Sequence, residues 1–315
     1  MVLINFTNDP KLQPAGNAID LFEKTLLFDN LYPFCPASYI MWGEWLSGQD
    51  ETWSKIPYKY KNCEWLVLQS IPIFIVNRDF CGKTIYCPAL KRDVTVPDNR
   101  LPNITLGMGR HLEEESCVYD EYGEDHDSGF SRKTTEPSSY IDTWACFTVL
   151  KDSSKPHSKY EMGGMPAVFV WMDKIIEATD SNEQANMLFA LTMLHETGHA
   201  LMHNGIFYND EIHNWCEEAL ANAYALGKIA MSHDTRFYDF ATEVVMKQPA
   251  NYALGAKLAQ SFGLHEIKHL MEIWTDMQIR HASKELRTQL MNYVKTAKTL
   301  DLRTLSSFYK QVIEE

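Results

Sequence analysis

The segment Leu194-His195-Glu196-Thr197-Gly198-His199-Ala200 does more than any other to define the fold. His195 and His199 are four residues apart, so in a helix they lie one above the other on the same face, where both imidazoles can bind a single metal ion. The preceding residues predict a helix, because apolar side chains recur at helical spacing at Met187, Leu188, Leu191 and Leu194.

Sequence signals at both ends limit this predicted helix to about residues 182–204. Ser181 and Gln184 form a capping-box pattern at its start, and the pair Asn204-Gly205 can end it in a left-handed turn. Gly198 costs roughly 1 kcal/mol of helix propensity relative to alanine. A glycine at this place suggests that another backbone element passes close to the helix, and a glycine that the helix merely tolerates is the alternative.

The H-E-x-x-H sequence is the signature of zinc hydrolases, in which the glutamate, here Glu196, acts on the attacking water. A catalytic zinc takes three protein ligands. A second predicted helix, over about residues 210–231, can supply the third. Glu217 and Glu218 are adjacent on it, and their side chains point about 100° apart around its axis. The same segment also offers Asp210, Glu211 and His213.

Glu218 follows His199 by nineteen residues, and an H-E-x-x-H sequence with a glutamate at this distance resembles the gluzincin metallopeptidases. Residues 189–203 look most like the ImmA/IrrE-type intracellular peptidases. The resemblance covers about residues 165–231. It implies an α+β, zincin-like domain with a small mixed sheet, an H-E-x-x-H helix and a glutamate helix. The implied Zn²⁺ ligands are His195, His199 and Glu218, and Asn222 is expected to support His195 by a hydrogen bond.

Residues 165–172 are apolar, contain a proline near their start and predict a strand just before the H-E-x-x-H helix. The resemblance implies that this strand is the sheet edge, where it would hold an extended substrate by main-chain pairing. A plain core strand is the alternative.

The expected activity is hydrolysis of peptide bonds in a peptide or protein substrate. Glu196 would act as the general base that takes the proton of the water and later delivers it to the leaving amine. Tyr208, His213 and Tyr224 are candidates for the donor that stabilises the oxyanion. Two alternatives stay open: a non-catalytic zincin scaffold that binds a protein partner, and a zinc hydrolase of a non-peptide bond.

A second H-E-x-x-H sequence occurs at His265-Glu266-Ile267-Lys268-His269. Its two histidines share the polar face of a predicted amphipathic helix with Glu272. Lys268 places a charge inside the motif, and no glutamate follows at the nineteen-residue distance. We therefore predict a solvated helix face here. His203, one turn beyond His199, is expected to lie near a helix C-terminus rather than to bind the metal.

The chain carries a formal net charge of −13, and residues 111–127 hold eight acidic side chains without a lysine or arginine. This pattern predicts an exposed acidic loop, and the acidity argues against nucleic-acid binding. The seven cysteines form no C-x-x-C pair, which favours reduced thiols in a cytoplasmic protein. We expect no membrane span, because no run of eighteen apolar residues occurs, and no signal peptide at the start.

The rest of the pattern predicts two regions. Residues 1–155 form a mixed α/β N-terminal region, and residues 156–315 form the zincin-like catalytic region with C-terminal helices. In the first region, helices are expected at 18–28 and 38–46 and strands at 65–76, 84–96 and 144–150. Beyond residue 232, helices are expected at 236–247, 252–262, 265–280, 284–298 and 302–315.

Overall fold

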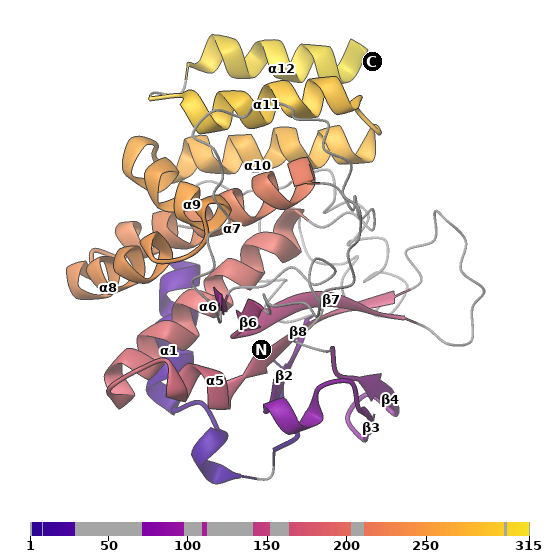
Figure 1. The fold of residues 1–315 in the computed structure, drawn as a ribbon, viewed down its shortest axis with the longest axis vertical. Helices are drawn as coiled ribbons and strands as arrows, with labels where there is room; N and C mark the ends of the chain where they lie inside the picture. Colours follow the sequence, from indigo (N-terminus) through magenta and orange to yellow (C-terminus); the bar gives the residue numbers. More distant parts are fainter. Residues whose placement is uncertain are drawn as a thin grey trace, which may run out of the picture.

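The computed structural model describes residues 2–7, 9–28, 71–97, 109–111, 141–151, 164–202, 211–298 and 301–314. The fold is of mixed α+β class (Figure 1). The strands are β1 (Val2–Asn5), β2 (Pro72–Val76), β3 (Thr84–Cys87), β4 (Arg92–Thr95), β5 (Gly109–His111), β6 (Ile141–Thr143), β7 (Ala145–Lys151) and β8 (Gly164–Trp171). The helices are η1 (Pro10–Leu12), α1 (Gly16–Leu27), η3 (Arg78–Phe80), α5 (Met172–Glu177), α6 (Asn182–Met202), α7 (Glu211–Met231), α8 (Thr235–Met246), α9 (Ala250–Ser261), α10 (Leu264–Ile279), α11 (Lys284–Thr296) and α12 (Leu302–Glu314).

Four of the strands form one mixed sheet in the order β1-β2-β8-β7. The first three are parallel neighbours, whereas β7 runs antiparallel to β8, with Ala145 opposite Val170 and Lys151 opposite Gly164. β8 thus lies inside the sheet, so the expectation that it forms the sheet edge is wrong and the core-strand alternative is confirmed. Residues 167–171 are all buried, and such a continuous apolar run is typical of a strand covered on both faces.

The two faces of this sheet are covered differently. One face, which includes Ile73 and Val168, packs in the main core with α1 and α6. The opposite face, which includes Phe74 and Phe169, packs against the β3–β4 hairpin. The rings of these two phenylalanines stack with their centroids 4.8 Å apart. Helix α6 contacts β7 on one side and α7 on the other, so the H-E-x-x-H sequence lies between the sheet and the remaining helices (Figure 1).

The C-terminal helices are confirmed at the places the sequence predicts, within a few residues at each end. In Figure 1, α10, α11 and α12 lie as successive rows beyond α7. Their buried side chains join the same core as α6 and α7, as Leu270 of α10, Leu290 of α11 and Phe308 of α12 illustrate. The helical layer and the sheet therefore share one core.

In the N-terminal region, helix α1 and strand β7 are confirmed close to their predicted bounds, but one strand prediction is wrong. Residues 84–96 form a hairpin rather than a single strand, because residues 88–91 turn and Lys91 adopts a left-handed φ of 53°. Of the predicted strand 65–76, residues 72–76 form β2, which begins at Pro72, as suits a residue without a backbone N–H, and residues 65–70 lie outside the described residues. The predicted helix 38–46 lies outside the described residues, and so does the acidic segment except for residue 111.

Strands from the two predicted regions pair with each other. β2 lies next to β8, and α1 contacts α6. Position 155 falls between β7 and β8, two neighbours in one sheet.

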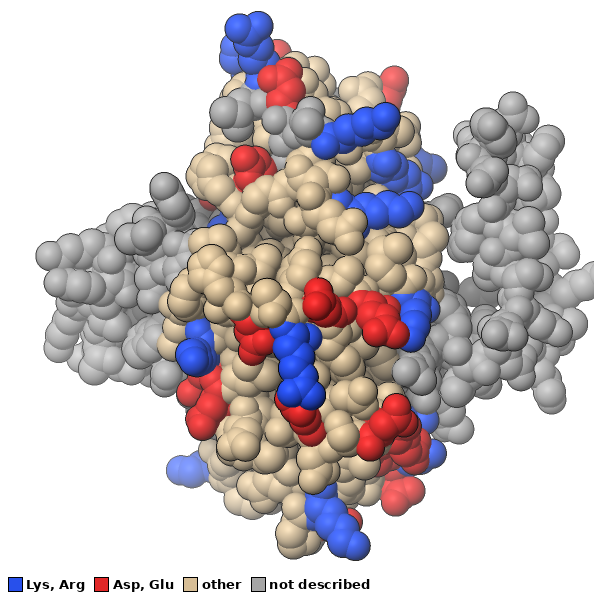
Figure 2. All heavy atoms as spheres, turned by 90° about the vertical axis from the view of Figure 1, so that its left-hand side faces the viewer, with Lys and Arg blue, Asp and Glu red and all other residues tan. Residues whose placement is uncertain are grey.

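None of the described helices has both the length and the apolar character needed to cross a membrane. On the face seen in Figure 2, the acidic and basic side chains of the described residues are interspersed.

Candidate metal centre

Helix α6 begins with the side-chain cap that the sequence indicates. The backbone N–H of Gln184 donates to Ser181 Oγ at 3.2 Å, and Gln184 Oε1 accepts from the backbone N–H of Asp180 at 2.8 Å. In an ordinary capping box the side chain of Gln184 would bind the backbone N–H of the capping residue, Ser181. Here it binds the N–H of Asp180, one residue earlier. Every residue from Met187 to Met202 is buried, so this helix runs through the core.

Helices α6 and α7 touch backbone to backbone at Gly198. A Cβ added there would lie 2.9 Å from Ala221 Cα, a distance that real Cβ atoms essentially never show, and 3.3 Å from Ala221 O, which is also tight. The expected close approach of another backbone element is therefore confirmed, and the element is α7. This contact places Glu218, one turn before Ala221, opposite the two histidines.

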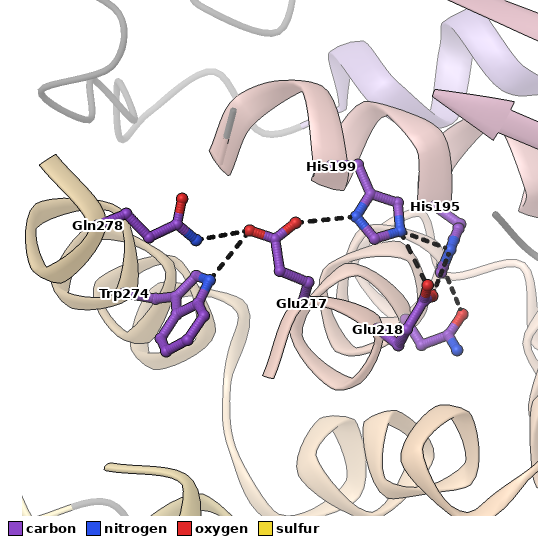
Figure 3. A network of polar contacts seen from close by, with 7 residues as sticks. His195, His199, Glu217, Glu218, Trp274 and Gln278 are labelled. Atoms are coloured by element: carbon purple, nitrogen blue, oxygen red, sulfur yellow. Dashed lines mark hydrogen bonds and ion pairs between the residues drawn. The ribbon is translucent and has the colours of Figure 1, made fainter. Parts of the chain in front are cut away.

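Three buried side chains converge at this crossing (Figure 3). The Nε2 atoms of His195 and His199 lie 3.0 Å apart. Glu218 Oε2 lies 3.2 Å from His195 Nε2 and 3.4 Å from His199 Nε2. The ligand atoms of all three lie within 4.8 Å of one another, and within the described part of the chain no other group of three such residues could hold a metal ion.

The charges of these side chains compensate one another. Burial would raise the pKa of Glu218, but the charge of His199 and hydrogen bonds from both histidines lower it to about 2. Burial would lower the pKa of His199, but the charge of Glu218 and hydrogen bonds to Glu217 and Glu218 raise it to about 10. Burial lowers the pKa of His195. A metal cation could replace the proton on His199 as the positive partner of the buried carboxylate.

The Nδ1 atom of His195, which we call its outer nitrogen because it points away from the three converging ligand atoms, faces Asn222. Asn222 lies one turn after Glu218 on α7. Asn222 Oδ1 lies 2.8 Å from His195 Nδ1, the contact that the resemblance implies for this residue. Asn222 Nδ2 in turn donates to the backbone oxygen of Tyr252 at 3.3 Å, which fixes the orientation of its amide. Helix α9 therefore supports His195 through Asn222.

The outer nitrogen of His199 faces a different residue, Glu217. Glu217 Oε2 lies 3.2 Å from His199 Nδ1. The other carboxylate oxygen, Oε1, accepts from Trp274 Nε1 at 3.0 Å and from Gln278 Nε2 at 2.7 Å (Figure 3). Both of these donors come from α10. The sequence offers Glu217 as a competing ligand. In the structure it contacts the Nδ1 side of the His199 ring and is not one of the three residues whose ligand atoms converge.

Tyr252 of α9 is a member of the site that the sequence does not indicate. Its ring stacks on His195, with the centroids 6.0 Å apart. Burial is the main cause that raises the pKa of the Tyr252 phenol. The charge of Glu218, a hydrogen bond to Glu218 and the charge of Glu196 raise this pKa further. Tyr252 stands 30 residues after Asn222 in the chain, and no spacing rule connects them.

Glu196 is fully buried on α6, next to the first histidine. Its charge raises the pKa values of both His199 and Tyr252, so the carboxylate lies within electrostatic reach of the cluster. It is not one of the three converging ligand side chains.

The second H-E-x-x-H sequence lies on the outer side of α10, as predicted. His265 is exposed, and the side chain of His269 is 43% exposed and pairs with Glu272, Nδ1 to Oε2 at 3.0 Å. The histidine rings are 4.7 Å apart, but no third ligand among the described residues joins them. Lys268, within this motif, is buried.

The group that converges within the described residues includes none of the remaining candidates from the sequence. His203, Tyr208 and Asp210 lie outside the described residues, as do the side chains of Glu211 and His213. Tyr224 is buried in the core of α7. None of Cys81, Cys87, Cys146 and Cys216, the cysteines of the described part, forms a disulfide.

Comparison with known proteins adds no family assignment, because no family model, curated protein or solved structure matches this chain.

Proposed function

We propose that this chain is a zinc-dependent metallopeptidase of gluzincin type with a zincin-like fold. The observation that carries the proposal is the convergence of His195, His199 and Glu218 in one buried cluster, with Glu196 beside it. Two imidazoles and one carboxylate are the ligand set of many catalytic zinc sites, which keep a fourth position open.

The three side chains fit a divalent cation. They are buried, their ligand atoms lie within 4.8 Å of one another, and the outer nitrogen of each histidine faces an oxygen. Nδ1 of each ring already faces a hydrogen-bond partner, Asn222 or Glu217. Nε2 of each ring is therefore the atom available to bind the metal. When bound, zinc would polarise the scissile carbonyl and make water nucleophilic near neutral pH.

The chain's own residues then divide the remaining work. Glu196 takes the proton of the attacking water and delivers it to the leaving amine. Asn222 orients His195, and the Tyr252 phenol holds the carboxylate of Glu218. We propose a peptide or protein as the substrate and the cytoplasm as the place of action.

The decisive experiment compares Glu196→Gln with the wild type, both loaded with zinc, on a library of internally quenched fluorescent peptides. We expect turnover to fall by at least about 10²-fold, because the variant lacks the base. Zinc content and the free energy of unfolding should persist, because Glu196 is not a ligand. Glu218→Ala should instead lose zinc and turnover together.

Glu183→Gln is the matched control, because Glu183 lies on the same helix but is exposed at its start. It should retain wild-type turnover. Turnover by Glu196→Gln at the wild-type rate would contradict the role of the base. A zinc-loaded wild type that cleaves no more peptide than the chelator-treated protein would contradict the peptidase proposal and favour a scaffold.

A further inference from the structure

We propose that Glu217 is a positioning residue for His199, locked in place by Trp274 and Gln278, so that α10 forms part of the metal centre. This inference rests on the metal site of the proposed function and adds a residue to it. All three side chains are buried, with exposed fractions of 2%, 0% and 1% for Glu217, Trp274 and Gln278.

The role follows from the two nitrogens of the His199 ring. Nε2 faces Glu218 and His195, so Nε2 is the atom that would bind the metal. A neutral imidazole that binds a metal through Nε2 carries its proton on Nδ1 and needs an acceptor there. Glu217 Oε2, 3.2 Å from Nδ1, is that acceptor. The carboxylate therefore selects the tautomer that can bind the metal.

The donors on the far side explain why a carboxylate stands here. The indole Nε1 of Trp274 can only donate, and the amide nitrogen of Gln278 donates to the same oxygen, Glu217 Oε1. The side chain of residue 217 must therefore accept hydrogen bonds at both of its terminal atoms, one from His199 and the other from Trp274 and Gln278. A carboxylate does so, whereas an amide has one accepting end and one donating end.

The two histidines are thus supported from different helices and by different chemistry. His195 is oriented by a neutral amide, Asn222, which α9 holds through the backbone oxygen of Tyr252. His199 is oriented by an anion that α10 holds. An anionic partner increases the basicity of a ligand histidine more than a neutral one, so the contribution of Glu217 to metal affinity should be the larger.

The test measures zinc affinity by competition with a chelator, together with the visible spectrum of the Co²⁺-substituted protein. We expect Glu217→Gln to weaken zinc binding by about 10- to 100-fold, the usual effect of losing an outer partner of a ligand histidine. If the amide oxygen of the variant faces His199, its NH₂ meets the indole N–H of Trp274. If the amide is reversed, its NH₂ faces Nδ1 and favours the wrong tautomer.

A second substitution distinguishes this role from mere packing. In the double variant Glu217→Gln/Trp274→Phe the indole donor is gone, and the Gln278 amide can rotate to accept from the new NH₂. The double variant should therefore bind zinc more tightly than Glu217→Gln alone, and its Co²⁺ spectrum should be closer to that of the wild type. Glu272→Gln is the control, because Glu272 lies on the solvent side of α10, the helix that carries Trp274. Its zinc affinity and Co²⁺ spectrum should match those of the wild type.

The outcomes separate this inference from the proposed function. His199→Ala is measured in parallel. If it leaves zinc affinity unchanged, the metal centre itself is misplaced. If His199→Ala loses zinc while Glu217→Gln binds it as tightly as the wild type, only the inference about Glu217 fails. A double variant that is folded but no better than Glu217→Gln would also overturn it.

Discussion

Gly198 of α6 and Ala221 of α7 are so close that a Cβ on the glycine would lie 2.9 Å from the Cα of the alanine. This contact sets the distance between the helix that carries both histidines and the helix that carries Glu218. The convergence of the three candidate ligands therefore depends on the absence of one methyl group.

We predict that Gly198→Ala destabilises the protein by about 1–3 kcal/mol, the range for overpacking a core, and weakens zinc binding as the helices move apart. Urea denaturation and chelator competition measure the two effects. Gly227→Ala on α7 is the matched control, because its new Cβ would meet side-chain atoms alone: the flexible end of Leu264 at 3.0 Å and Ile267 Cδ1 at 3.5 Å. A Gly198→Ala protein as stable as the wild type would contradict the predicted backbone contact.

The metal content should distinguish the two H-E-x-x-H sequences. Metal-replete protein is expected to contain close to one zinc per chain by elemental analysis, and His199→Ala should lose most of it. The double variant His265→Ala/His269→Ala should keep its zinc and lose less than about 1 kcal/mol of stability, as surface substitutions usually do. Zinc that survives His199→Ala but disappears from the double variant would move the site to α10.

The stability of chelator-treated protein should depend on pH through His199 and Glu218. The pKa of His199 is raised to about 10, so its contribution is complete below its ordinary value of 6.5 and is lost as the pH rises towards 10. The pKa of Glu218 is lowered to about 2, so its contribution is complete above its ordinary value of 4.5 and is lost as the pH falls towards 2. The pair should therefore stabilise the folded state most between about pH 4.5 and 6.5.

Urea denaturation at a series of pH values tests this expectation. Glu218→Gln removes the negative partner of His199, so the loss of stability between pH 6.5 and 10 should be smaller in this variant than in the wild type. Equal slopes in the two proteins would show that His199 is not paired with Glu218 in solution. The same comparison is unaffected by surface groups, because both proteins share them.

Much of the helical structure and the identity of the three converging residues could be predicted from the sequence alone. Helix ends follow from local signals, such as Ser181 before α6, and apolar spacing identifies the buried face of each helix. Two histidines four residues apart share a helix face by geometry. The resemblance in spacing indicated Glu218 as their partner, and the structure places it there.

Only the tertiary structure decided the roles that depend on contacts distant in the chain. Glu217 stands next to Glu218, and helix geometry alone indicates only that the two point in different directions. Its partners Trp274 and Gln278 come from a helix that follows 57 and 61 residues later. The position of β8 inside the sheet likewise depends on pairing with β2, nearly a hundred residues earlier. Local sequence determines which face of an element is apolar, but the packing of the whole chain determines what that face meets.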